Sequence, residues 1–161
     1  MGINYIGIGE IAVSNKPEDI IKTMALGSCV GIMLYDPKLK IAAMGHIALP
    51  DSKVRGSRGM DKPGRYADTG IPLLVKAIQN KGSNGGRNLT VKIAGGAQIN
   101  DPNDTFNIGK RNVLAVKKIL WKCSLILNAE DTGGHIGRTM DVKVDTGEVT
   151  LSSPGRSKWK L

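Results

Sequence analysis

Two residues in this sequence are suited to nucleophilic chemistry: a cysteine in a turn of small residues and a histidine on a later apolar segment. Cys29 ends the run Leu26-Gly27-Ser28-Cys29, and His46 is the first of only two histidines. A nearby imidazolium stabilises a thiolate, and the thiolate attacks a carbonyl carbon. Cys29 and His46 are therefore our candidate nucleophile and base.

A predicted β-hairpin would bring this pair together. Two short apolar runs, residues 30–35 and 40–45, flank Asp36 and Pro37, which favour the first two positions of a type I turn. If the turn is centred between Pro37 and Lys38, the numbers of cross-strand partners sum to 75, as those of Cys29 and His46 do. Direct partners have Cβ atoms about 4.5–5.5 Å apart. A bulge would shift this register by one and turn one side chain to the opposite face.

The same chemistry needs a group that orients the imidazole and donors for the oxyanion. Thr23 and Ser28 are the candidates for the orienting group. On a regular strand Thr23 would share the face of Cys29, whereas Ser28 would point away. The backbone N–H of Cys29 and a neighbouring N–H from the Gly27-Ser28 turn are the candidate oxyanion donors.

Other interpretations of the cysteine remain open at this point. Cys29 could be an inert buried thiol, the common role of a cysteine in a reduced protein. A zinc site built from Cys29, His46, Cys123 and His135 has enough ligands, but it lacks the short paired spacing of structural zinc sites. Cys123 follows apolar residues at helical spacing and is expected to pack on the buried face of a helix.

Composition indicates one globular domain spanning residues 1–161, with 40% hydrophobic residues. The sequence has no run of about 18 apolar residues and no signal peptide, so we expect a cytoplasmic protein that does not insert into membranes. Both cysteines should then be reduced. The net charge of +9 favours an acidic protein partner. Nucleic acid is not expected, because the basic residues are scattered and aromatic residues are few.

The pattern of elements predicts an α+β fold. Expected strands are residues 5–13 with a break near Gly9, 20–26, the hairpin, 89–94, 125–129, 140–144 and 149–152. Two helices are expected, one capped by Asp68 or Thr69 and ending at Lys81, the other from residue 107 or 108 to Cys123. Residues 130–138 read as a glycine-punctuated turn. Strict alternation, which a parallel doubly wound sheet would need, is absent.

Glycine and charge dominate the predicted loop at residues 51–65, directly after His46. It is either a solvated loop or a basic lip over the site, with Arg55 and Arg58 as candidate contacts. Three glycine clusters, at Gly27 and at positions 95–96 and 133–134, follow predicted strands, where backbone could approach a substrate closely. None has the spacing of a phosphate-binding loop.

Ordered blocks along nearly the whole chain resemble the CheD family of chemoreceptor glutamine deamidases. They are TMALGSCV (23–30), GHIALP (45–50), RYAD (65–68), KIAGGA (92–97), IGKRNV (108–113), EDTGG (130–134), GR (137–138) and TGEV (146–149). Two positions depart from the family pattern. Gly70 stands where alanine is common, and His135 occupies a variable position in the glycine turn.

The resemblance implies hydrolysis of glutamine side-chain amides on chemoreceptor cytoplasmic helices, through a thioester and with release of ammonia. It assigns Cys29 as nucleophile, His46 as base and Thr23 as the orienting residue, with no metal or organic cofactor. It also implies binding of the phosphatase CheC. The implied fold is a layered sandwich of mixed and antiparallel sheets with two main helices on one side, similar to the catalytic domain of cytotoxic necrotizing factor. Alternatives are a cysteine amidase or thioesterase with another substrate, and a non-catalytic adaptor that binds receptors and CheC.

Overall fold

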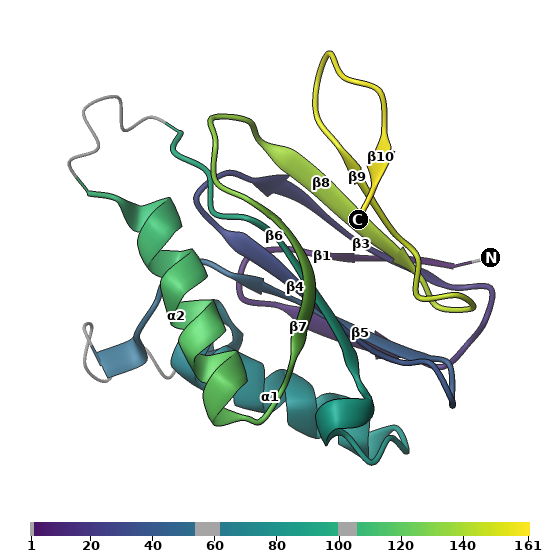
Figure 1. The fold of residues 1–161 in the computed structure, drawn as a ribbon. Helices are drawn as coiled ribbons and strands as arrows, with labels where there is room; N and C mark the ends of the chain where they lie inside the picture. Colours follow the sequence, from purple (N-terminus) through teal and green to yellow (C-terminus); the bar gives the residue numbers. More distant parts are fainter. Residues whose placement is uncertain (1, 54–61, 100–105) are drawn as a thin grey trace.

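Two five-stranded β-sheets pack face to face, and the two long helices cover the outer face of one of them (Figure 1). The computed structural model describes residues 2–53, 62–99 and 106–161. The first sheet has the strand order β1-β3-β8-β9-β10, and the second has the order β2-β5-β4-β6-β7. The pairs β1–β3 and β6–β7 are parallel, and the other pairs are antiparallel.

The elements follow one another along the chain in the order strands, helix, strand, helix, strands. Their bounds are β1 Ile3–Ile6, β2 Ile11–Ser14, β3 Ile20–Leu26, β4 Val30–Asp36, β5 Ile41–Ile47, the 3-10 turn η2 Pro63–Arg65, α1 Ala67–Asn80, the 3-10 turn η3 Gly86–Asn88, β6 Thr90–Gly95, α2 Ile108–Lys122, β7 Leu127–Thr132, β8 Arg138–Lys143, β9 Val149–Ser152 and β10 Trp159–Lys160.

Two apolar cores hold these layers together. One lies between the sheets and includes Met33 and Met44, and the other lies between the second sheet and the helices and includes Ile32 and Leu74. Strands β4 and β5 face both cores, so every one of their residues is buried. This explains why both strands read as continuous apolar runs rather than as alternating patterns. The α+β layered sandwich predicted from sequence is confirmed, and the similarity to the necrotizing factor domain stays a prediction.

The hairpin exists, but its predicted register is wrong by two residues. Asp36 pairs with Ile41, so four residues form the loop, and the last of them, Lys40, has a φ of +53°. The Asp36 carboxylate accepts the backbone N–H groups of Lys38 and Leu39, both at 3.0 Å. The longer loop moves the centre of the turn by one residue, so that the numbers of paired residues sum to 77 and His46 faces Gly31.

Two other sequence expectations also need correction. Helix α1 has Tyr66 at its N-cap, and the Asp68 carboxylate instead accepts the backbone N–H and hydroxyl of Ser52, at 2.9 and 2.7 Å. Strand β7 begins two residues later than predicted and continues to Thr132, so residues 130–132 belong to a strand and not to the expected turn. Strand β7 pairs in parallel with β6, with a register shift opposite Asn128.

Candidate active site

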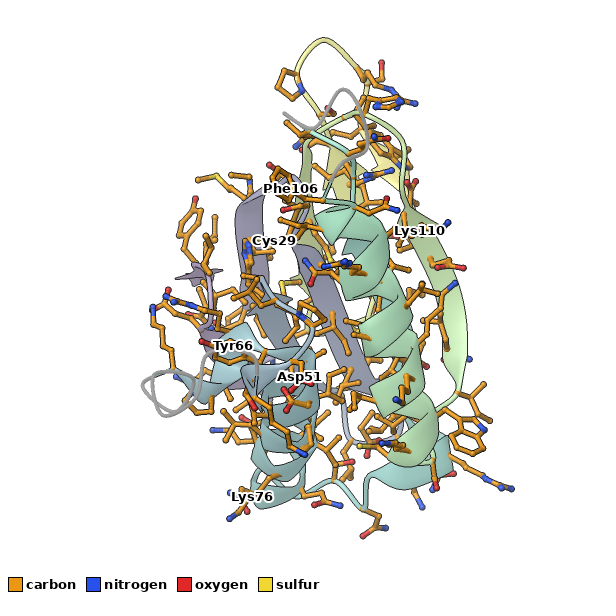
Figure 2. The ribbon with its side chains drawn as sticks, turned by 90° about the vertical axis from the view of Figure 1, so that its left-hand side faces the viewer. Cys29, Asp51, Tyr66, Lys76, Phe106 and Lys110 are labelled. Atoms are coloured by element: carbon orange, nitrogen blue, oxygen red, sulfur yellow. The ribbon has the colours of Figure 1, made fainter. Side chains whose placement is uncertain are left out.

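The turn that carries Cys29 crosses from the first sheet to the second. It connects the bulged end of β3, where Ala25 has a φ of +59°, to the start of β4. The Gly27 and Cys29 carbonyls accept backbone N–H groups of Ala97 and Gly96, both at 2.8 Å. The turn is therefore fixed to the end of β6, and Cys29 lies in the upper half of the molecule in Figure 2.

Cys29 and His46 are not direct cross-strand partners, but they belong to the same face of the second sheet. His46 lies opposite Gly31, two residues after Cys29, so the two side chains are diagonal neighbours in this register. A Cβ atom on Gly31 would lie 2.9 Å from Met140 Sδ and 3.0 Å from Leu26 Cδ1, both in the core between the sheets. The error of two residues therefore preserves the predicted face, and both side chains belong to the side that packs on β3 and β8.

Thr23 on β3 contacts His46 across the space between the sheets. The Thr23 hydroxyl donates to the carbonyl of Ile6 at 2.9 Å and lies 2.7 Å from His46 Nδ1. A hydroxyl has one hydrogen, and the Ile6 carbonyl can only accept. His46 Nδ1 must therefore carry a hydrogen and donate it to Thr23. In the neutral ring this leaves Nε2 with the free lone pair, the form required of a general base.

Burial keeps the side chains of Cys29 and His46 uncharged. His46 is 1% exposed, and desolvation lowers its pKa from 6.5 to about 4. Desolvation also raises the pKa of the half-buried Cys29 thiol. A neutral thiol and a neutral imidazole therefore predominate at pH 7, in contrast to the imidazolium–thiolate pair expected from sequence. His46 Nε2 is buried and has no hydrogen-bond partner among the described residues.

The turn also presents two unused backbone donors. The N–H of Gly27 donates to the carbonyl of Ala25 at 3.1 Å and is not available. Within the described part of the chain, no hydrogen bond uses the N–H of Ser28 or Cys29. Of the candidates in the turn, these two N–H groups can bind the oxyanion of a tetrahedral intermediate.

A cavity of about 380 Å³ opens beside the turn. Ser28, the start of α2 and two glycine-containing loops line it, at residues 96–99 and 132–135. Phe106, at the same end of the molecule as Cys29 in Figure 2, belongs to the lining. Nothing in the sequence alone marks Phe106 as a lining residue.

The glycine clusters differ in their roles. A Cβ atom on Gly95 would overlap the Cys29 carbonyl oxygen, and one on Gly96 would overlap the side chain of Val113. These two glycines let the chain approach its own backbone and α2, and Gly96 also lines the cavity, so the expectation that a substrate approaches there stays a prediction. Gly133 and Gly134 have φ values of +84° and +69°, and a Cβ atom on either would meet nothing within 4 Å.

Of the remaining predicted residues, only His135 lines the cavity among those that the structure describes. Arg55 and Arg58 lie outside the described residues. His135 Nδ1 lies 3.2 Å from the carbonyl of Gln98, and Cys123 packs against the core beneath the helices. Among the described residues, no group of His, Cys, Asp or Glu could hold a metal ion, so the four-ligand zinc hypothesis has no support. No helix in the described ranges is long and apolar enough to span a membrane.

Asn112 is a part of the site that the sequence reasoning missed. Its side-chain amide donates to the carbonyls of Ser28 and Ala48, both at 2.9 Å. A signal was present, because Asn112 precedes Val116 and Leu120 at four-residue spacing on the buried face of α2. An amide on an apolar stripe requires hydrogen-bond partners, which only the folded structure identifies.

Comparison with known proteins gives a consistent result. The family model described as CheD chemotactic sensory transduction matches residues 48–153. A "Probable chemoreceptor glutamine deamidase CheD" of Syntrophotalea carbinolica is 52% identical over 157 residues, which are 97% of this chain and 97% of the relative. The "Chemoreceptor glutamine deamidase CheD" of Thermotoga maritima is 45% identical over 150 residues, 93% of this chain and 91% of the relative. A relative from Solibacter usitatus is 43% identical over 153 residues, 95% of this chain and 90% of the relative.

Proposed function

This chain belongs to the CheD family, and from that premise we propose that it is a chemoreceptor glutamine deamidase with Cys29 as its nucleophile. Its substrates are glutamine side chains on chemoreceptor cytoplasmic helices, and its products are glutamate and ammonia. The observation that carries the assignment of the site is the hydrogen bond between Thr23 and His46 Nδ1. It leaves His46 Nε2 free to accept a proton on the sheet face shared with Cys29.

The reaction begins with a neutral thiol. As Cys29 Sγ attacks the amide carbon, its proton moves to His46 Nε2 and the S–C bond forms. The N–H groups of Ser28 and Cys29 bind the resulting oxyanion. When the intermediate collapses, the C–N bond breaks and His46 donates its proton to the leaving ammonia. A thioester remains on Cys29.

Hydrolysis of the thioester restores the enzyme. His46 Nε2 takes a proton from a water molecule as its oxygen attacks the thioester carbon, and the same two N–H groups bind the second oxyanion. The C–S bond then breaks, the Cys29 thiol recovers its proton, and glutamate is released. Thr23 acts through the imidazole, because its contact holds the ring orientation and the tautomer through both steps. No metal or organic cofactor takes part.

The partners in this proposal are acidic proteins in the cytoplasm. A chain with a net charge of +9 attracts acidic helices through long-range electrostatics. We include the phosphatase CheC as a second partner, because the sequence blocks resemble a family that binds it. Nucleic acid is not part of the proposal.

The decisive experiment incubates the protein with chemoreceptor cytoplasmic domains and measures released ammonia and the small mass gain on each converted glutamine. Cys29→Ala should abolish both signals while the receptor still binds. Cys123→Ala is the matched control, because it removes the other thiol, on the helix side of the second sheet. It should lower stability at most by about 1–3 kcal/mol and leave the chemistry intact. Full activity of Cys29→Ala would overturn the nucleophile assignment.

The same assay separates the two alternatives. An adaptor would bind receptor domains without any mass change, in the parent protein as in Cys29→Ala. A cysteine amidase or thioesterase with another substrate would leave receptor glutamines intact but would still form an acyl adduct on Cys29 with its own substrate.

A further inference from the structure

Asn112 connects the two segments that carry the proposed nucleophile and base. It lies in the second turn of α2, and its side chain is fully buried. Its Nδ2 donates one hydrogen to the carbonyl of Ser28, the residue before Cys29, and the other to the carbonyl of Ala48, two residues after His46. One amide group therefore ties the turn before β4 to the segment that follows β5.

The main-chain ladder cannot make this connection. Pairing between β4 and β5 ends at Val30 and Ile47, and the chains separate beyond that pair. Among the residues that the structure describes, neither the Ser28 nor the Ala48 carbonyl has another donor. The Asn112 side chain replaces the next rung of the ladder, at the position where Cys29 would face Ala48.

The orientation of the amide is determined by its partners. Both are carbonyls, which only accept hydrogen bonds, so the NH₂ group must face them. Asn112 Oδ1 is then buried and has no partner within the described ranges. A buried acceptor without a partner lowers stability, whereas an apolar residue in its place would leave two carbonyls unpaired instead. The arrangement therefore satisfies two backbone carbonyls and leaves one side-chain oxygen without a hydrogen bond among the described residues.

We propose that Asn112 is a positioning residue that sets the separation between the Cys29 turn and the His46 strand. It does not touch the reacting atoms, and the inference rests on the proposed roles of Cys29 and His46. Transfer of a proton from Sγ to Nε2 depends on the distance between these atoms, and a misplacement of about 1 Å can reduce a rate about 100-fold. Removing the amide leaves two carbonyls without their hydrogen-bond donor. One belongs to Ser28, directly before Cys29, and the other to Ala48, two residues after His46.

The test compares two kinds of variant, both expected to lower the stability of the fold. One kind also loses the hydrogen bonds from the Asn112 amide, and the other keeps them. Asn112→Ala removes both donors, and Asn112→Asp keeps the volume but replaces the donors by an acceptor. Val116→Ala is the matched control, because Val116 is fully buried one turn further along the same face of α2 and makes no bond to either carbonyl. Thermal unfolding of all three variants gives the stability against which activity is compared.

We expect both Asn112 variants to lower kcat on a receptor fragment about tenfold or more, with KM changed less than about twofold. Val116→Ala should keep the kcat of the parent when assayed below its unfolding temperature. The proposal is overturned if either folded Asn112 variant keeps the parental kcat. It is also overturned if Val116→Ala loses as much kcat at equal stability.

A second measurement works without any receptor. The rate at which iodoacetamide alkylates Cys29 is followed against pH in a Cys123→Ala background, where Cys29 is the remaining thiol. Asn112→Ala should alter this profile and Val116→Ala should not, because only the first removes the hydrogen bonds that hold the Cys29 turn beside the His46 strand and it adds no charge near the thiol. Identical profiles would refute the role of Asn112. If the parent alkylates normally but deamidates no receptor, the proposed substrate fails while the positioning role is still decided.

Discussion

At the scale of single residues, the site depends on where one hydroxyl hydrogen goes. The Thr23 hydroxyl donates its one hydrogen bond to the Ile6 carbonyl, so Thr23 can only accept a hydrogen bond from His46. This arrangement holds an imidazole that is neutral and has Nε2 free, even though the ring is almost fully buried. A neutral ring in an apolar space is a stronger candidate for a base than for a charge that stabilises a resting thiolate.

Substitution of Thr23 tests whether the hydroxyl acts through the imidazole. Thr23→Val keeps the shape but leaves His46 Nδ1 without a partner, so single-turnover rates should fall about tenfold to 100-fold. Thr23→Ser keeps the hydroxyl and should retain most of the rate. A Thr23→Val protein as inactive as Cys29→Ala would not fit an orienting role, and one as active as the parent would remove Thr23 from the mechanism.

The lowered pKa of His46 predicts an unusual pH profile. The free enzyme loses its base as pH falls through the pKa of His46, which burial places at about 4. The acidic limb of kcat/KM should therefore lie near pH 4 rather than near the ordinary value of about 6.5. Measurement of initial rates between these values, with a receptor fragment that stays folded, decides the matter. A limb near 6.5 would mean that the imidazole is not desolvated in the working enzyme.

At the scale of elements, sequence patterns identified the strands and helices better than their registers. Asp36 and Pro37 mark where the hairpin turns, but nothing in them reveals that Lys40 adopts a left-handed conformation and lengthens the loop. The face of Cys29 was predictable because a shift of two residues preserves the side-chain alternation. The contacts of Asn112 were not, because they join α2 to residues more than sixty positions earlier in the chain.

The end of β6 offers a test of whether its contact with the Cys29 turn matters for activity. Gly95 has a φ of +114°, and a Cβ atom there would overlap the Cys29 carbonyl oxygen. Gly95→Ala should therefore lower the free energy of unfolding by about 3 kcal/mol or more and also reduce kcat.

Gly82→Ala is the control for that substitution. Gly82 has a similar φ of +121°, but a Cβ atom would meet only Ile41 Cδ1, at 4.0 Å. Its stability should fall by about 1–3 kcal/mol from backbone strain alone, with kcat unchanged. Urea unfolding and deamidation rates compare the two. If both variants lose the same stability and have the same kcat, the close approach of Gly95 to the Cys29 carbonyl affects neither stability nor catalysis.

At the scale of the whole molecule, the proposed site lies where two sheets and a helix meet. The first sheet supplies Thr23, the second supplies His46, the crossing between the sheets supplies Cys29, and α2 fixes that crossing. The sequence indicated the chemistry of these residues, whereas their convergence depends on how the layers pack. The segment after His46 returns to the same place, because Ala48 donates to the carbonyl of Arg65 at 2.8 Å. The two described ends of the segment between Ala48 and Arg65 are therefore held together directly after the strand that carries His46.

The net charge of the protein and the position of the basic residues directly after His46 in the sequence predict a salt-dependent rate of association with an acidic partner. Electrostatic steering acts mainly on the association rate and weakens as salt screens it, over about 10 Å at 0.1 M ionic strength. Replacing Arg55 and Arg58 by Ser should slow association with an acidic receptor fragment about threefold or more at low salt, and little at high salt. Turnover of a short glutamine peptide should stay unchanged, because the chemistry at Cys29 is untouched.

The control for this double variant removes the same charge elsewhere. Lys76 lies on α1 at the end of the molecule opposite Cys29 in Figure 2, and Lys81 follows the same helix. Replacing both by Ser lowers the net charge equally but leaves the surroundings of the site intact. Stopped-flow association at several salt concentrations should separate the two double variants, because local charge steers approach to the site more than distant charge does. If both slow association equally, the net charge alone attracts the partner. If neither does, Arg55 and Arg58 have no part in binding the receptor.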